Sequence, residues 1–416
     1  MLAPGQGLAG IDGETGMMQE QPVHFRRAGE IQPIFGSLPP LALYIHIPWC
    51  IRKCPYCDFY SNRLTGELDE DGYIAVLQRD IEQALPLIWG RRIISIFIGG
   101  GTPSLFSAAG IDRLLSIVRS LLPVMPDAEI SMEANPGTFE IEKFKAYRDT
   151  GINRLSIGIQ SFNPGHLQAL GRIHGREEAL TAAKTARQWF DQVNLDLMVG
   201  LPGQTLEQFQ QDVQTAVACD PTHLSLYQLT IEPNTPFAAH PPVLPDEDIL
   251  DSMQQWMEQA LPDMGFQHYE VSAWAKPGCQ CQHNSNYWLY GDYLGIGAAA
   301  HSKITLPDGR IIRRMCVRNP GAYMVGDEAG KTPFEEAFEV SVDDRRFEFM
   351  MNALRFVNGF PTRLFEERTG LPLASISEPL QLAESKNLLK VSPATICPTP
   401  LGMRFLNDLQ EIFLPD

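Results

Sequence analysis

The 416-residue chain is short of positive charge, of long apolar runs and of cysteine. It carries 33 Lys and Arg against 50 Asp and Glu, a net charge of −17, which argues against non-specific binding to nucleic acid or to an anionic lipid surface. No run of roughly 18 apolar residues predicts a membrane span. The first residues also lack the basic start and apolar run of a secretory signal, so we expect a cytoplasmic protein.

A strand–helix rhythm begins at residue 41. Segments with helical spacing alternate with β-rich, largely apolar runs at 41–47, 94–100, 129–134, 154–160, 193–200 and 223–230. This alternation predicts an α/β fold with a parallel sheet and right-handed crossovers. Six units favour a partial (β/α) barrel over a flat doubly wound sheet. In such barrels the chemistry gathers where the strands end.

Composition divides the chain into four parts. Residues 1–40 are rich in Gly, Pro and Gln without a period, which predicts a flexible N-terminal extension. The barrel is expected over 41–245, followed by a connecting, loop-rich and aromatic region over 246–340. Residues 341–416 predict a small, mainly helical domain of the winged-helix kind, ending in one helix over 401–413.

Eight cysteines are too few for a disulfide scaffold in a chain of this length. Cys50, Cys54 and Cys57 follow the first predicted strand, and this crowding indicates a metal site in a reducing compartment. Thiolates suit iron–sulfur clusters and zinc. A [4Fe–4S] cluster on three cysteines leaves one iron open for S-adenosylmethionine (SAM), whereas zinc normally needs a fourth protein ligand, for which His46 and Cys279 are candidates.

Polar residues also follow the other predicted strands. The run Gly99–Thr102 either presents backbone groups to a ligand or forms a tight turn. Glu133 suits hydrogen bonds to ribose hydroxyls, and its alternative is a solvated loop carboxylate. Gln160 closes the fourth strand, and Asp196 lies in the fifth.

A second candidate site is the segment His283-Asn284-Ser285-Asn286-Tyr287-Trp288. A neutral imidazole is a good axial ligand for haem iron, and neighbouring aromatic rings stack on porphyrins. The alternative is a structural histidine that makes hydrogen bonds. Cys279 and Cys281 are further candidates as haem or metal ligands, and His301 is expected to be structural.

The motif YIHIPWC-IRKC-PYC resembles the signature of the radical SAM superfamily, and the chain from residue 41 to 416 resembles its coproporphyrinogen dehydrogenase (HemN)-type branch, most of all the haem chaperones called HemW. Other matching runs include IFIGGGTPSL, MEANPGT, SIGIQSF, LGRIHG, NLDLMVGLPGQ and QCQHNSNYW. The resemblance implies that the three cysteines hold a [4Fe–4S] cluster, whose electron cleaves bound SAM to a 5′-deoxyadenosyl radical. It implies SAM contacts at Tyr44, Tyr56, Gly100, Gly101, Thr102, Glu133, Gln160, Arg172 and Asp196.

Within that set, Gln160, Arg172 and Asp196 match a second SAM position that some members have. The haem contacts implied are His283, Asn284, Tyr287 and Trp288. No residue is assigned a catalytic role.

One departure from the resemblance separates two functions. Members that decarboxylate coproporphyrinogen carry a fourth cysteine where this chain has Phe59. The resemblance therefore implies a haem chaperone that passes haem to client proteins and takes an electron from a donor to its cluster. The alternatives are an oxygen-independent coproporphyrinogen III oxidase in porphyrin biosynthesis and a radical SAM enzyme unrelated to haem.

Overall fold

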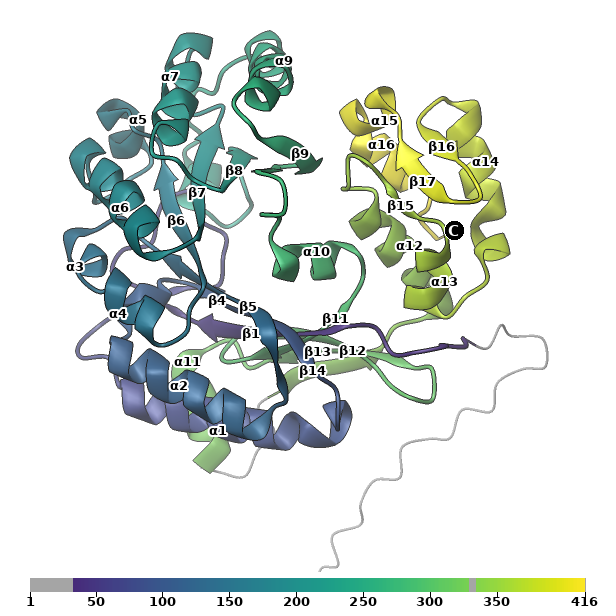
Figure 1. Ribbon diagram of the computed structural model, residues 1–416, viewed down its shortest axis with the longest axis horizontal. Helices are drawn as coiled ribbons and strands as arrows, with labels where there is room; N and C mark the ends of the chain where they lie inside the picture. The colour runs from purple at the N-terminus through teal and green to yellow at the C-terminus, as the bar shows by residue number, and fades with distance from the viewer. Residues whose placement is uncertain (1–32, 329–333, 416) are drawn as a thin grey trace, which may run out of the picture.

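The computed structural model describes residues 33–328 and 334–415. All six predicted barrel strands are present and run parallel to one another, in the order β1, β4, β5, β6, β7, β8 (Figure 1). Their bounds are Leu41–Ile47, Ile93–Gly100, Val124–Ala134, Arg154–Gln160, Gln192–Val199 and His223–Gln228. The prediction of a partial parallel barrel is confirmed.

Helices cover the outer face of the sheet (Figure 1). They are α1 (Glu70–Ile88), α2 (Ala108–Leu121), α3 (Thr138–Ile141), α4 (Phe144–Asp149), α5 (Pro164–Ala169), α6 (Arg176–Trp189) and α7 (Leu206–Val217). Side-chain caps fix several starts: Ser107 accepts from the Gly110 N–H, and Thr205 and Gln208 form a capping box at α7. Short 3₁₀ turns lie at Pro103–Leu105 and Leu373–Ile376.

The two faces of the barrel strands differ in polarity. Leu43 and Ile45 of β1, like Ile96 and Ile98 of β4, are fully buried in the main core. The alternate residues point the other way, and on β4 these are Ser95 and Phe97. The inner face of the barrel therefore carries polar side chains that must find partners away from bulk water.

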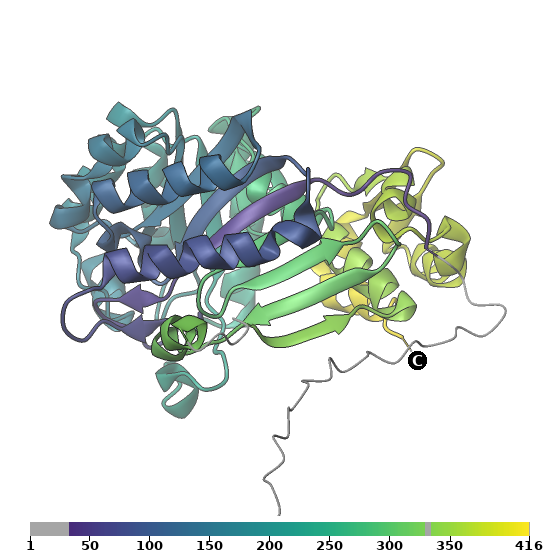
Figure 2. The ribbon, with the colours of Figure 1, turned by 90° about the horizontal axis from the view of Figure 1, so that it is seen from below.

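The connecting region, predicted to be loop-rich, contributes strands to both edges of the main sheet. Strand β11 pairs in parallel with β1, and β12, β13 and β14 continue the same sheet in antiparallel order (Figure 2). At the other edge β10 and β9 follow β8, so half of the 12 strands come from this region. Its elements are α8 (Pro236–Ala239), α9 (Glu247–Asp263), β9 (Gln267–Glu270), β10 (Ala273–Ala275), α10 (Gln282–Trp288), β11 (Asp292–Ile296), β12 (His301–Thr305), β13 (Ile311–Cys316), α11 (Pro320–Glu328) and β14 (Phe334–Glu339).

The C-terminal unit is mainly helical and has its own core. Around a three-stranded sheet it places α12 (Val342–Ala353), α13 (Arg363–Thr369), α14 (Ser377–Ser385), α15 (Pro400–Arg404) and α16 (Leu406–Glu411). The sheet strands are β15 (Phe360–Pro361), β16 (Leu389–Val391) and β17 (Thr395–Pro398). The predicted single helix over 401–413 is wrong, because the non-helical backbone of Phe405 divides it.

The predicted N-terminal extension falls in two parts. Residues 1–32 lie outside the described residues. By contrast, the Ile34 N–H donates to the Gly370 carbonyl at 2.8 Å, and Phe35 packs on the C-terminal core. The Pro40 carbonyl accepts from the Asp292 N–H at 2.9 Å. Residues 33–40 thus belong to the folded protein, contrary to the expected flexible arm.

A buried ion-pair group joins the barrel to β11 and β12. Asp292 is fully buried and accepts from Lys303 Nζ at 2.9 Å and from Arg91 Nη2 at 2.7 Å. The N–H of Thr305 adds a third bond at 2.8 Å.

Within 33–328 and 334–415, no helix combines the length and apolar character needed to cross a membrane.

We expect Asp292→Asn to lower the free energy of unfolding by about 3 kcal/mol, because Lys303 then stays buried without its counter-charge. Urea denaturation followed by circular dichroism measures the change. The control is Asp149→Asn, which breaks the exposed pair with Lys145 and should cost less than about 1 kcal/mol. Equal losses in the two variants would contradict the structural role of Asp292.

Candidate functional site

The three predicted cluster cysteines lie on one loop at the carboxyl end of β1. Within this loop β2 (Trp49–Cys50) and β3 (Asn62–Arg63) form a two-stranded parallel sheet. The thiols of Cys50, Cys54 and Cys57 are free and half-buried. Arg172 Nη1 lies 3.7 Å from Cys54 Sγ. The β2–β3 pairing and the contact of Arg172 with Cys54 therefore hold the loop in place.

The arrangement fits a cluster better than a single zinc ion. In the described part of the chain, no three His, Cys, Asp or Glu side chains converge closely enough to hold one metal ion. Zinc draws its ligands to within about 2.3 Å of one point, whereas each thiolate of a cubane binds its own iron. His46 is also engaged at both ring nitrogens, with Tyr44 Oη at 2.8 Å and the Tyr60 carbonyl at 2.9 Å.

The other proposed zinc ligand, Cys279, is remote from the loop. Its carbonyl accepts from Arg154 and its sulfur from Gln192. These two residues begin β6 and β7, so Cys279 lies at the opposite end of the parallel strands. The structure does not bring it to the cysteine triplet.

The glycine run after β4 packs tightly on the cysteine loop. Gly100 has a φ of 112°, and a Cβ there would meet the His46 ring at 2.5 Å. A Cβ on Gly101 would meet the Trp49 carbonyl oxygen at 2.5 Å. Only glycine allows this approach.

The backbone donors of this run are already used. The N–H groups of Gly101 and Thr102 donate to the carbonyls of Ile47 and Trp49, both at 2.7 Å. The Gly100 N–H donates to Glu133 Oε2 at 3.1 Å. Of the backbone groups expected to face a ligand, these three N–H groups are therefore engaged within the protein. Carbonyl oxygens remain, and these accept from an amino group such as that of SAM.

Two carboxylates lie inside the barrel near this run. Burial and the nearby Asp196 carboxylate raise the pKa of Glu133 to about 8, against the opposing bond from Gly100. Burial also raises the pKa of Asp196, which Asn194, Ser156 and Ser225 oppose by hydrogen bonding. Glu133 stands at the end of β5, half-buried, and is not a solvated loop carboxylate. The two carboxylates are suited to hydroxyl donors.

Gln160 and Arg172 meet beside the same strand ends. Gln160 has a φ of 66°, rare for a residue with a side chain. Arg172 Nη2 donates to the Gly158 carbonyl at 2.7 Å and to Asn135 Oδ1 at 2.8 Å. Because Arg172 also reaches Cys54, it ties β6 to the cysteine loop. Asn135, which bonds Thr102 as well, is a residue that sequence reasoning missed.

The two predicted tyrosines have different surroundings. Tyr44 shares a hydrogen bond with His46, whereas Tyr56 packs on a small apolar group that includes Leu170 and Phe237. The ring centroids of Tyr56 and Phe237 are 6.3 Å apart. Tyr56 therefore buttresses the loop, and Tyr44 stands inside the barrel.

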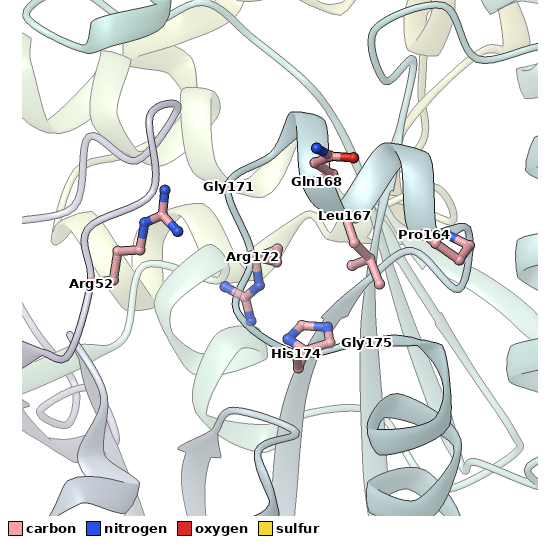
Figure 3. Close-up of a pocket in the computed structure, with 8 residues that line it drawn as sticks. All are labelled: Arg52, Pro164, Leu167, Gln168, Gly171, Arg172, His174 and Gly175. Carbon is pink, nitrogen blue, oxygen red and sulfur yellow. The ribbon is translucent and has the colours of Figure 1, made fainter.

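A pocket of about 270 Å³ opens beside the cysteine loop (Figure 3). Arg52 of the loop lines one side, and Arg172 and His174 line the other. An adjoining pocket adds Cys54, Thr102 and Asn135. Arg52 and His174 were not predicted, although His174 stands in the LGRIHG run, which resembles the HemN-type branch.

His283 lies on α10, which sits on the inner side of the sheet between the barrel and the C-terminal unit (Figure 1). Its side chain is buried, and its Nδ1 is 3.2 Å from Ser95 Oγ. Its ring centroid lies 5.1 Å from that of Phe97 and 6.4 Å from that of Tyr44. Burial lowers the pKa of His283 to about 4, despite the nearby Glu129 carboxylate. The imidazole is therefore neutral at physiological pH, as a metal ligand must be.

Glu129 of β5 anchors the first turn of α10. Its carboxylate accepts from the N–H groups of Gln282 at 3.0 Å and of His283 at 3.2 Å. The thiol of Cys281 lies 3.4 Å from the same carboxylate, and Arg154 lies at 3.9 Å. Cys281 is thus buried and already engaged. No sequence pattern pointed to Glu129.

The other predicted haem residues do not share the surroundings of His283. Trp288 lies under the Arg355 guanidinium of the C-terminal unit, 4.1 Å from the ring centroid. Tyr287 is exposed and contacts the Trp288 and Tyr293 rings. Asn284 is half-buried. The structure therefore divides the predicted haem residues between the barrel interior and the boundary with the C-terminal unit. His301 is exposed at the start of β12.

Comparison with known families and proteins agrees with this geometry. The family model described as the radical SAM superfamily matches residues 44–216, and the HemN C-terminal domain matches residues 340–405. The chain is 48% identical over 381 residues to "Heme chaperone HemW" of Escherichia coli K12, covering 91% of this chain and 100% of that protein. The protein of the same name from Mycobacterium tuberculosis H37Rv is 33% identical, with 81% and 87% covered.

Among solved structures, coproporphyrinogen III oxidase (HemN) of Escherichia coli, described as a radical SAM enzyme, superposes with a TM-score of 0.77. The two chains are 25% identical, and 90% of each is covered. The superfamily implies a [4Fe–4S] cluster and SAM. The chain belongs to the HemW family within the radical SAM superfamily.

Proposed function

We propose that this protein is a haem chaperone, which binds haem and transfers it to haem-requiring client proteins. The observation that carries the proposal is the state of His283: a neutral, buried imidazole whose Nδ1 is held by Ser95. Its Nε2 makes no hydrogen bond to any described residue. The names of the HemW relatives support the same function.

The cluster is assigned to Cys50, Cys54 and Cys57. Three thiolates leave the fourth iron for SAM, and the neighbouring residues supply polar partners for that molecule. The proposed SAM contacts are Tyr44, Tyr56, Gly100, Gly101, Thr102 and Glu133, with Gln160, Arg172 and Asp196 toward a second SAM position. The electron comes from a separate donor protein. The proposed location is the cytoplasm, where reducing conditions keep the eight free cysteines as thiols.

Haem is proposed to bind through His283 as axial ligand, with Asn284, Tyr287 and Trp288 beside the porphyrin. Since His283 is only 8% exposed, a porphyrin reaches it only after the elements that cover α10 move away from it. Trp288 and Tyr287, at the boundary with the C-terminal unit, are placed to contact the ring as that happens. Haem entry is therefore coupled to a local opening.

A decisive experiment is a haemin titration of anaerobically reconstituted protein, followed by mixing with an apo-haemoprotein acceptor. We expect a saturable Soret shift and transfer of the haem. Absence of saturable binding would contradict the proposal.

The alternative activity is oxidative decarboxylation of coproporphyrinogen III, which the overall likeness to HemN supports. Phe59, 64% exposed on the cysteine loop, stands where that branch has a cysteine. Turnover of coproporphyrinogen III by the reconstituted protein would favour the alternative.

Replacing Cys54 by Ala should abolish the broad cluster absorbance after anaerobic reconstitution, because two thiolates do not hold a stable cubane. Iron and sulfide analysis measures the loss. Cys397→Ala, in β17 of the C-terminal unit, is the matched control and should reconstitute normally. Full iron and sulfide in the Cys54 variant would show that the ligand assignment is wrong.

His283→Ala should weaken haem binding at least about tenfold, the scale of losing one axial ligand interaction of about 1.4 kcal/mol, and leave the cluster spectrum intact. Haemin titration gives the affinity. His301→Ala removes an exposed histidine and should bind haem like the unaltered protein. An unchanged affinity in the His283 variant would remove this histidine from the site.

SAM affinity should rise with pH up to about 8, the pKa of Glu133 in the empty pocket. Only the ionised carboxylate offers both oxygens to two ribose hydroxyls, so binding releases a proton below that pH. The dissociation constant should fall by at most about tenfold per pH unit. Calorimetric titrations between pH 6.5 and 8.5 test this, and Glu133→Gln should bind weakly without the pH dependence. A pH-independent affinity in the unaltered protein would refute it.

A further inference from the structure

His283 is held in place by two barrel residues that lie outside its own segment. Ser95 is fully buried on β4 and contacts the imidazole. Glu129 on β5 contacts the backbone of the same residue. The two strands are adjacent, and Ser95 and Glu129 are register partners across them. Two neighbouring residues of the barrel sheet therefore contact the His283 ring and the backbone of the helix that carries it.

The hydrogen bonding of His283 differs from that of His46 and His223. His46 is bonded at both ring nitrogens, and so is His223, to Asn194 Oδ1 at 2.6 Å and Tyr269 Oη at 2.8 Å. Among the described residues, His283 has a partner at Nδ1 alone. His283 therefore has one ring nitrogen, Nε2, that a ligand can use.

The Ser95 hydroxyl lies at Nδ1, so Nε2 is the nitrogen that is left for a ligand. When the Nδ1–H donates to Ser95 Oγ, the lone pair is on Nε2, the nitrogen without a protein partner. Histidines that bind metals generally donate their other ring N–H to a neighbouring acceptor, which fixes the tautomer and the ring orientation. The Ser95 hydroxyl stands where such an acceptor is required.

Glu129 makes hydrogen bonds to the backbone of the helix. Its carboxylate takes the first two N–H groups of α10, at Gln282 and His283, which have no partner within the helix. Arg154 at 3.9 Å and the Ser131 hydroxyl at 3.2 Å hold the carboxylate itself. The start of the helix is thereby fixed to the barrel wall, and with it the Cα of His283.

We propose that Ser95 and Glu129 are positioning residues for haem coordination by His283: Ser95 accepts the Nδ1–H when Nε2 binds the iron and holds the ring plane, and Glu129 sets the start of the helix. This inference rests on the proposed function. It assigns the geometry of the haem ligand to β4 and β5, outside the haem-type segment itself.

The test compares haemin titrations and ferric haem spectra of full-length Ser95→Ala, Ser95→Thr and Glu129→Gln, with His283→Ala as reference. Ser95→Ala should weaken haem binding about 10-fold or more, the usual cost of losing the partner of a ligating histidine, and should shift the reduction potential of bound haem. Ser95→Thr keeps the hydroxyl and should restore most of both. Glu129→Gln should weaken binding in the same direction.

Ser302→Ala is the matched control, since it removes another buried serine whose partner is Gly295 and which does not touch His283. It should leave haem affinity and potential unchanged. Cluster absorbance and thermal melts of each variant establish that it is folded.

The outcomes separate this inference from the proposed function. Haem affinity and potential unchanged in Ser95→Ala and Glu129→Gln, with binding lost in His283→Ala, would overturn the positioning role alone. Equal losses in the Ala and Thr variants at an unchanged potential would mean that Ser95 only fills space, and would also overturn it. Unaltered protein that fails to bind haem would overturn the proposed function itself.

Discussion

The structure depends on satisfying polar groups that are buried inside the barrel. Glu129, Glu133 and Asp196 all lie on inward faces of the strands, Glu129 buried and the other two half-buried, and each carboxylate requires donors or a cation within reach. Glu129 obtains them from Arg154 and from the first turn of α10. That requirement brings α10 onto the inner side of the sheet. The placement of His283 follows from it.

Close backbone contacts hold the cysteine loop against the end of β4. Gly100 and Gly101 touch the His46 ring and the Trp49 carbonyl so closely that a side chain at either position would collide. Their N–H groups donate hydrogen bonds to the Glu133 carboxylate and the Ile47 carbonyl. The loop, the end of β4 and the end of β5 therefore form one rigid unit. A cluster held there would sit in a fixed relation to the inner carboxylates.

Tyr44 lies where the two candidate sites meet. Its hydroxyl bonds His46 beneath the glycine run, and its ring approaches those of Phe97 and His283. The groups proposed to contact SAM and the groups proposed to contact haem thus share a neighbour. Tyr287 and Trp288 lie at the other end of α10, against Tyr293 and Arg355. The helix therefore spans from the barrel interior to the C-terminal unit.

Local patterns in the sequence determined the barrel strands, most of the helices and the cysteine triplet, because alternation, helical spacing and a three-thiolate loop are written within short stretches. The positions of the sheet extension and of α10 were decided only by tertiary structure. Strand β11 pairs with β1 across most of the chain, and His283 meets Ser95 and Glu129 at separations of 188 and 154 residues. No local period encodes such contacts, because they arise when distant polar groups are buried together. The sequence pattern thus identified His283 as a candidate, and the tertiary structure determined which residues hold it.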